Sequence, residues 1–449
     1  MKLGPLAITP IVLSITLIAA QAQSSAVSEL TRPRTVSSPA SQSTKILQTS
    51  AQTVPQKQSP EPLQTPSPQP AGSPTVVPPQ SVELAGTEPD AAEAPKTLLP
   101  LSPHTIRARI AEAERLFKSR PMPTSMGPSI QFVTLSALDQ TTARIHQITL
   151  LKETFLTKGS EFTTTSSLGV PLSIRVLRAN GVNTAVVIFD NQGRSLTPLL
   201  VEFPIEKRGV FRELAYYTSA HPALLSSDLA RSGQLYVRTM LDLAAKRLRE
   251  KDAFISPQIV DVAERLCLVE HVDHERFRQE NRGALFQEIY SLFALNELDT
   301  YRYSVSSAGA GGMVQMIPWA YTLMKQRHPG VGLTPDFVTG MRNHGNALQA
   351  MLLYMQDTWN DLAVNEEVQY ALNSKLATQP ELLAAGYNSN AARLPGYLKR
   401  GGSSWRTLIP RETQMYLQIY KNFEALVPIK PRSTPQNSSG STAGSSNRN

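Results

Sequence analysis

Apolar and polar residues alternate in short runs over residues 101–225, after an opening stretch with helical spacing. The run 172–176 reads Leu-Ser-Ile-Arg-Val, and alternation of this kind is typical of a strand with one buried face. Asn180-Gly181 and the stretch 190–193 are turn sequences that separate such runs. We therefore predict a small sandwich or partial barrel. The predicted strands are 130–135, 144–151, 172–176, 185–189 and 199–203, and the predicted helix is 105–118.

From Ser226 onward the apolar spacing becomes helical. Apolar residues recur every three to four positions between 237 and 248, on a helix that we expect to run to about Lys251. Ser256 followed by proline is a favourable N-cap and first-position pair for the next helix. A further amphipathic run covers 285–295. The sequence thus predicts an α+β protein, in which a mostly helical domain follows a small β-rich domain.

The first 22 residues have the composition of a secretory signal peptide. They contain one lysine, an apolar run from Leu6 to Ala20, and the small-residue pattern of a cleavage site at Ala20-Gln21-Ala22. Because the run is short and interrupted by proline, we predict a cleaved leader, with an uncleaved membrane anchor as the alternative. No cysteine lies near this site, which argues against a lipoprotein anchor.

Two further stretches have the composition of chain that does not fold. Residues 23–100 are rich in Pro, Ser, Gln, Thr and Ala, and cannot bury enough apolar surface to form a core. As a linker they would span about 50 Å if coil-like and up to about 250 Å if mostly polyproline. The predicted organisation is a signal peptide at 1–22, a linker at 23–100, a β-rich domain at 101–225, a helical domain at 226–427 and a disordered tail at 428–449. The helices over 228–275 either belong to the helical domain or connect the two domains.

The charge and the cysteine content restrict the class of partner and the means of stabilisation. The formal net charge of +8 and the pI near 9.5 favour an anionic partner such as cell wall. Nucleic acid would share this preference, but a secretory leader and the lack of a nucleic-acid motif argue against it. The single cysteine, Cys267, excludes an internal disulfide, and its apolar surroundings predict a buried structural thiol.

Candidate chemistry centres on one carboxylate, Glu297, at the end of the run 285–295. Residues 306–312 follow, composed only of Ser, Ala and Gly, and then an apolar segment with a single amide, Gln315. Small residues let backbone approach a ligand closely, and a lone acid beside such a surface suits proton transfer to a sugar oxygen. Most glycosidases use a second carboxylate, but the nearest, Asp299, would point about 200° away from Glu297 on a continuous helix. A single acid fits a mechanism in which the substrate supplies the nucleophile.

Histidines give no equally specific signal. His271 and His274 stand three positions apart, a spacing that metal sites use, but no further ligand lies near them in the sequence. We interpret them as part of a solvated helix face. His344 has no partner evident in the sequence. We therefore predict neither a metal nor a cofactor.

Blocks of residues around and beyond Glu297 follow a known order. Ser306 lies nine positions after Glu297, and 309–315 reads Gly-Ala-Gly-Gly-Met-Val-Gln. Ala385-Gly386-Tyr387-Asn388 comes next, and 412–416 reads Glu-Thr-Gln-Met-Tyr. This order resembles the soluble lytic transglycosylases, lysozyme-like enzymes with an SLT domain that cut peptidoglycan. The family has an acid, a serine nine positions later, Gly-Ala-x-Gly-Leu-Met-Gln, Ala-x-Tyr-Asn and Glu-Thr-x-x-Tyr.

The resemblance covers roughly residues 255–427, and 346–354 looks like the helix between its blocks. Two departures stand inside it. Leu298 occupies the position where the family usually has serine directly after the acid, so a hydroxyl that could hold the acid or the sugar is absent. Ser389-Asn390-Ala391-Ala392 replaces a glycine-rich turn, so the turn has to form without glycine, although Asn390 tolerates the left-handed region better than most residues.

The resemblance implies an exported lyase of the periplasm or cell envelope that cleaves the β-1,4 bond between N-acetylmuramic acid and N-acetylglucosamine. A protonated Glu297 would donate to the glycosidic oxygen and then accept the proton of the muramic 6-hydroxyl, which leaves a 1,6-anhydromuramic end. Burial against apolar side chains would keep Glu297 protonated. The expected sources of this environment are Phe293, Leu295, Leu298 and Met313.

Further roles are implied only at matched positions. Tyr387 would hydrogen-bond or orient Glu297, Asn388 would fix the loop or bind sugar, and Gln315 would contact polar groups of the glycan. Ser306 and Met313 complete the predicted substrate-binding residues. The alternative is a non-catalytic peptidoglycan-binding scaffold with a lysozyme-like groove. Partners are glycan strands and, through the β-rich domain, other envelope proteins; the oligomeric state and the choice between internal and terminal cleavage stay open.

Overall fold

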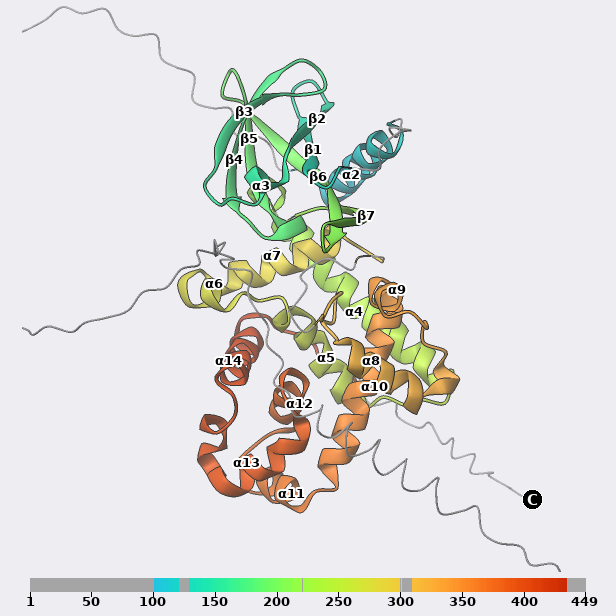
Figure 1. Ribbon diagram of the computed structural model, residues 1–449. Helices are drawn as coiled ribbons and strands as arrows, with labels where there is room; N and C mark the ends of the chain where they lie inside the picture. Colours follow the sequence, from blue (N-terminus) through green and yellow to red (C-terminus); the bar gives the residue numbers. More distant parts are fainter. Residues whose placement is uncertain (1–100, 121–128, 220, 299, 301–308, 434–449) are drawn as a thin grey trace, which may run out of the picture. The chain divides into compact units, whose positions relative to one another are not determined.

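The computed structural model of the 449-residue chain describes residues 101–120, 129–219, 221–298, 300 and 309–433 (Figure 1). The predicted leader, the linker and Ser306 lie outside the described residues, as does most of the predicted tail. Within this part of the chain, no helix combines the length and the apolar character that crossing a membrane requires. It contains an antiparallel sheet and many helices, which confirms the predicted α+β class.

The sheet is antiparallel throughout, and its strands follow the order β2-β1-β6-β5-β4-β3, with β7 pairing to β6. The long strand β6 pairs with β5 near its start and with β1 and β7 further along, so the sheet curls (Figure 1). The strands are β1 (Phe132–Asp139), β2 (Arg144–Leu151), β3 (Glu161–Thr165), β4 (Pro171–Arg178), β5 (Ala185–Asp190), β6 (Ser195–Lys207) and β7 (Val210–Tyr217). The alternating run 172–176 lies on β4 with its apolar side chains buried, as predicted.

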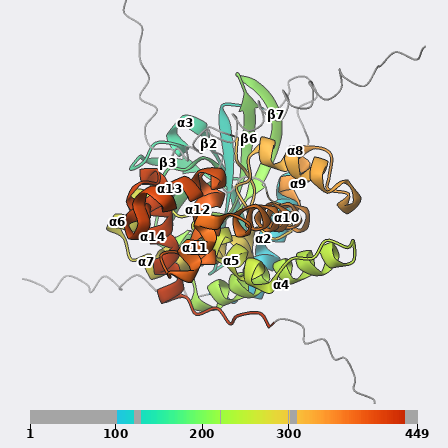
Figure 2. The same cartoon turned by 90° about the horizontal axis from the view of Figure 1, so that it is seen from below.

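The helices before the small-residue segment are α2 (Pro103–Lys118), α3 (Lys152–Phe155), α4 (Ser227–Arg249), α5 (Pro257–Val269), α6 (His274–Gln279) and α7 (Arg282–Leu295). The later helices are α8 (Pro318–Arg327), α9 (Phe337–Arg342), α10 (His344–Ala363), α11 (Glu366–Asn373), α12 (Gln379–Asn388), α13 (Leu394–Gly401) and α14 (Arg411–Leu426). The side chain of Ser256 caps α5, as predicted. Helices α11 to α14 group together in both views (Figure 1; Figure 2).

The sheet and the helices pack against each other and share a hydrophobic core. Buried apolar residues from strands and helices form one continuous cluster, and the described residues all fall in one compact unit. Arg178 of β4 contacts Glu288 of α7 at 2.7 Å, and Glu288 also binds Arg276 of α6. The predicted boundary at 225/226 therefore marks a change of secondary structure inside one packed unit.

Helices α4 and α7 approach each other closely at Gly233. A β-carbon built there would lie 1.8 Å from the carbonyl oxygen of Tyr290, so only glycine permits this separation. Helix α7 is the amphipathic run predicted at 285–295, and it ends just before Glu297. The packing of α4 thus fixes the position of the helix that precedes the candidate acid.

Candidate functional site

Helix α7 ends at a fixed point two residues before Glu297. Its C-cap, Asn296, is buried and pairs with the backbone of Thr218: the amide nitrogen of Asn296 donates to the carbonyl of Thr218 at 2.8 Å, and its oxygen accepts from the N–H of Thr218 at 3.0 Å. Because α7 stops at Leu295, the helical angle between Glu297 and Asp299 does not apply. Asp299 lies outside the described residues.

The carboxylate of Glu297 binds an arginine of the first described helix. Arg107 Nη2 donates to Glu297 Oε1 at 2.8 Å and to Ser232 Oγ of α4 at 2.7 Å, and Arg107 Nε donates to the carbonyl of Ala294 at 3.2 Å. The side chain of Glu297 is 35% exposed. The carboxylate of Glu297 is therefore already engaged by a guanidinium group that α2 contributes.

The predicted burial of Glu297 against apolar side chains is not seen among the described residues, since its side chain is 35% exposed. Phe293, Leu295 and Met313 are buried in the core, where they pack away from solvent, while Leu298 is 62% exposed. The prediction was wrong because it read residues near Glu297 in sequence as neighbours of its side chain. Helix packing instead draws most of these residues into the core and leaves Glu297 at the surface beside Arg107.

The residues that follow Glu297 are held by a tyrosine and a histidine. Leu298 has a positive φ of 68°, its N–H donates to Tyr236 Oη at 2.6 Å, and its carbonyl accepts from the N–H of His344 at 3.0 Å. Tyr236 Oη lies 2.6 Å from His344 Nδ1, and His344 Nε2 lies 3.3 Å from the carbonyl of Thr300. His344 therefore has several partners, contrary to the reading of the sequence, because its closest side-chain partner comes from α4, far away in the chain.

The segment 309–316 forms a tight turn. Gly311 and Met316 form a backbone bridge, and the side-chain amide of Gln315 donates to the carbonyl of Gly312 at 2.8 Å. Gly312 has a φ of +72°, and a β-carbon there would lie 2.5 Å from the carbonyl of Met341. Gln315 is 4% exposed. Its side chain thus helps to hold the turn, whereas the sequence pointed to a contact with glycan.

Side chains from two other elements hold the carbonyls of this turn. His271 Nε2 donates to the carbonyl of Met313 at 2.8 Å, and the hydroxyl of Tyr387 donates to the carbonyl of Val314 at 2.7 Å. His271 is half-buried and serves the turn, so the prediction of a solvated face does not hold for it. The expected bond from Tyr387 to Glu297 is replaced by the bond to Val314, since the carboxylate of Glu297 pairs with Arg107.

The last two sequence blocks meet in the core. Asn388 is 2% exposed, and its side-chain oxygen accepts from the hydroxyl of Thr413 at 2.9 Å. Tyr416, three residues further on, donates to the buried carboxylate of Glu270 at 2.9 Å. Asn388 therefore ties the end of α12 to α14, and the block 412–416 also reaches Glu270 at the end of α5.

The turn after Asn388 forms without glycine. Asn390 has extended backbone angles, φ −103° and ψ 105°, and its side-chain oxygen accepts from the N–H of Ala392 at 3.0 Å. It caps a short 3₁₀ turn at Ala391–Arg393. The left-handed conformation that Asn390 tolerates is not used, because side-chain capping gives the chain an alternative means of turning.

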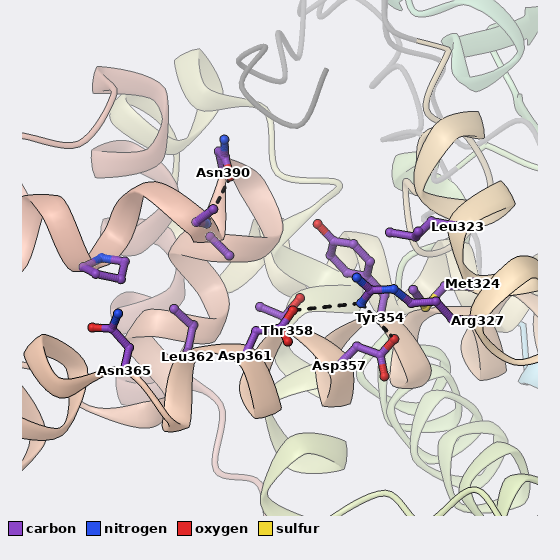
Figure 3. Close-up of a pocket in the computed structure, with 13 residues that line it drawn as sticks. Leu323, Met324, Arg327, Tyr354, Asp357, Thr358, Asp361, Leu362, Asn365 and Asn390 are labelled. Atoms are coloured by element: carbon purple, nitrogen blue, oxygen red, sulfur yellow. Dashed lines mark hydrogen bonds and ion pairs between the residues drawn. The ribbon is translucent and has the colours of Figure 1, made fainter. Parts of the chain in front are cut away.

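A cavity of about 250 Å³ lies beside this turn (Figure 3). Tyr354, whose ring meets that of Tyr387 edge-on at 5.8 Å, forms one wall, and Asn390 lies on the opposite side. Arg327 contacts Asp357 at 3.3 Å and Asp361 at 3.9 Å across the rim. The remaining lining residues are Leu323, Met324, Thr358, Leu362, Asn365, Ala391, Ala392 and Pro395. Hydroxyl, amide and apolar groups together suit a neutral polar ligand with methyl groups.

Sequence reasoning did not find this cavity, nor the roles of Arg107, Tyr236 and His344. Tyr354 belongs to the block 346–354, but nothing in the sequence shows that its ring meets Tyr387. Arg107 lies 190 positions before Glu297. Such contacts have no periodic signal, because they depend on how distant elements pack.

Three histidines make stability sensitive to acid. Burial lowers the pKa of His344 and of His271 to about 4 and that of His221 to about 3, from an ordinary value of 6.5. The unfolded chain therefore binds more protons than the folded protein between pH 6.5 and these values. The stabilisation is complete above about pH 6.5 and is lost as the pH falls toward about 4, by up to about 1.4 kcal/mol per pH unit for each histidine.

Urea unfolding between about pH 7.5 and 5 measures this effect. We expect the free energy of unfolding to decrease steadily over the lower half of that range, above the values at which carboxylates begin to titrate. His104→Gln, at an exposed position of α2, should keep the same slope. A flat profile from pH 6.5 to 5 would contradict the assignment of neutral, buried imidazoles.

Comparison with known proteins identifies no relative of this chain. No protein-family model, no curated protein and no solved structure matches the chain. Among the described residues, no three His, Cys, Asp or Glu side chains are grouped so as to hold a metal ion.

Proposed function

We propose that the protein is an exported peptidoglycan lytic transglycosylase with Glu297 as its acid. The observation that carries the proposal is the connection among the sequence blocks. Tyr387 of the third block binds the carbonyl of Val314 in the second, and Asn388 binds Thr413 of the fourth. Blocks separated by dozens of residues thus support one turn, as the parts of a single site would.

The reaction needs one acid and no external nucleophile. Protonated Glu297 donates its proton to the glycosidic oxygen, and the bond from that oxygen to the anomeric carbon of muramic acid breaks. The 2-acetamido group of the sugar stabilises the resulting positive centre. The carboxylate of Glu297 then accepts the proton of the 6-hydroxyl as the oxygen of that hydroxyl bonds to the anomeric carbon. The acid is regenerated and no water is consumed, which suits a site with one carboxylate.

Catalysis on this proposal requires the pair between Arg107 and Glu297 to open. An ion pair whose partners are both about one-third exposed contributes little to stability, so glycan binding has to overcome only a small free energy. Displacement of the guanidinium would leave the carboxyl group of Glu297 free to bind the glycosidic oxygen. The structure thus corresponds to a resting state of the proposed enzyme.

We propose that the glycan binds in the cavity beside Tyr354, next to the turn that follows Asn388. Its hydroxyl and amide groups complement sugar hydroxyls, and its apolar wall suits the methyl group of an acetamido substituent. We also propose a lysozyme-like fold for the helical part, because a groove of this kind would lie between helices around the central helix α10. The basic charge of the chain favours binding to an anionic wall.

The second candidate function is a non-catalytic peptidoglycan-binding scaffold. The ion pair between Arg107 and Glu297 favours it, because a scaffold needs no free acid. The exposed Leu298, where the family usually has serine, points the same way. On either proposal the leader at 1–22 and the linker at 23–100 would place the protein in the periplasm or cell envelope, with the sheet available to envelope partners.

Mass spectrometry of purified sacculi digested with the full chain distinguishes these proposals. We expect soluble fragments that end in 1,6-anhydromuramic acid. Fragments with reducing ends would instead identify a hydrolase and would require a base to activate water. Binding to sacculi without release of fragments would support the scaffold, and neither binding nor release would refute both.

A further inference from the structure

A tyrosine and a histidine enclose the residue that follows the proposed acid. Tyr236 comes from α4 and His344 from the first turn of α10, and each bonds to the backbone of Leu298. The hydroxyl of Tyr236 accepts from the N–H of Leu298 at 2.6 Å, and the backbone N–H of His344 donates to the carbonyl of Leu298 at 3.0 Å. Both backbone polar groups of Leu298 are therefore satisfied, one by each of these residues.

The number of protons available shows which group donates in the hydrogen bonds that connect Leu298 with Tyr236, Tyr236 with His344 and His344 with Thr300. An amide N–H only donates, so the oxygen of Tyr236 is the acceptor and its single proton is left to donate to His344 Nδ1, 2.6 Å away. Nδ1 is then unprotonated, and the proton of the neutral ring is on Nε2, which donates to the carbonyl of Thr300 at 3.3 Å. Burial keeps the imidazole neutral by lowering the pKa of His344 to about 4, and burial also raises the pKa of Tyr236.

The side chain of Leu298 does not explain the backbone conformation of this residue. Its φ of 68° lies in the left-handed region, where a β-carbon comes close to the following carbonyl oxygen and strains the backbone. The side chain is 62% exposed and contributes little packing to offset that cost. The two hydrogen bonds to the peptide unit are the interactions that stabilise the strained turn.

The turn at Leu298 determines where Glu297 points. Glu297 is fixed on its N-terminal side by Asn296, which pairs with Thr218, and on its C-terminal side by the clamped Leu298. Its carboxylate lies near enough to the hydroxyl of Tyr236 to act on it electrostatically. Neither Tyr236 nor His344 needs to touch a substrate in order to set this direction.

We propose that Tyr236 and His344 are positioning residues, which hold Leu298 in its left-handed turn and thereby aim the carboxylate of Glu297 at the glycosidic bond. This inference rests on the proposed function. It also explains how the chain dispenses with the serine that usually follows the acid: a clamp on the backbone takes over the task of holding the acid in place. A misplacement of about 1 Å in a catalytic group costs roughly 100-fold in rate.

Tyr236→Phe is the direct test, because it removes one hydroxyl and leaves the ring. Tyr290→Phe is the matched control: it makes the same change on the neighbouring helix α7, where the buried hydroxyl has no hydrogen-bond partner among the described residues. We expect Tyr236→Phe to lower kcat on soluble glycan strands about 10- to 100-fold with KM nearly unchanged. Tyr290→Phe should keep the parental kcat, and both variants should melt within a few degrees of the parent.

A second pair of variants separates positioning from folding. His344→Gln keeps an acceptor and a donor at the end of the side chain, so it should retain more activity than His344→Leu, which keeps neither. The ¹⁵N signals of His344 should show an unprotonated Nδ1 and a protonated Nε2 near neutral pH. A parent that releases no fragments would refute the proposed function, and the positioning role with it. An active parent whose Tyr236→Phe variant matches Tyr290→Phe, or a protonated Nδ1, would overturn the clamp alone.

Discussion

Glu297→Gln is expected to reduce the release of glycan fragments by about 10²- to 10⁴-fold, because glutamine has nearly the same shape but no proton to donate. Folding should be almost unchanged. Arg107 can still donate to the amide oxygen of glutamine, and the ion pair that is lost is 35% exposed on each side. Exposed pairs of this kind contribute about 0–1 kcal/mol, so the melting temperature should move by only a few degrees.

The matched control is Glu213→Gln. Glu213 forms an ion pair with Arg342 at 2.6 Å, and the two side chains are 31% and 35% exposed, close to the values for Glu297 and Arg107. The same change of charge and the same loss of a salt bridge should leave fragment release within a factor of about two, because this pair plays no part in the proposed chemistry. Retained activity in Glu297→Gln would refute Glu297 as the acid, and an equal loss in both variants would attribute the effect to charge.

The geometry around Glu297 explains why this test is needed. Arg107 of α2 donates to the carboxylate of Glu297, so this group is occupied before any substrate binds. The proposed enzyme must therefore exchange Arg107 for substrate, whereas the proposed scaffold would keep the pair. Loss of release on Glu297→Gln distinguishes these states, since a scaffold has no activity to lose.

Much of the fold was predictable because it depends on local patterns. The run 285–295 became α7, the alternation at 172–176 became β4, and Ser256 became an N-cap. Strand β3 was missed because it is short and polar apart from Phe162, with three consecutive threonines and no buried side chain. Strand β7 was missed because its residues are mostly half-buried and do not alternate clearly.

The sequence indicates which residues belong to the candidate site, but it does not indicate which groups their side chains contact. Glu297, Gln315 and Tyr387 could be found from their order along the chain, but spacing does not say what each side chain touches. Gln315 turned inward because its amide satisfies the carbonyl of Gly312, and Tyr387 turned toward Val314. Tyr236 and His344 meet across 108 positions, a separation at which no periodic pattern carries information.

Gly233→Ala is expected to destabilise the protein by about 3 kcal/mol, which would lower its melting temperature by roughly 5–10 °C. In most helices the same change stabilises by up to about 1 kcal/mol. Here the new methyl group would lie 1.8 Å from the carbonyl oxygen of Tyr290 and 2.5 Å from its carbonyl carbon. Both are backbone atoms of α7, so no side-chain rotation can relieve the overlap and the two helices must separate.

The separation should also reduce activity, because α4 carries Ser232 and Tyr236 and α7 leads to Glu297. Gly396→Ala is the control: it is a helical glycine of α13, and a β-carbon there meets only the flexible end of Arg400, at 3.2 Å. We expect that variant to be as stable as the parent or slightly more stable in urea unfolding. Equal stability of the two variants would show that α4 and α7 do not pack as closely as they do in the structure. The position of Glu297 would then have to be fixed by Asn296 and the clamp on Leu298, without support from helix packing.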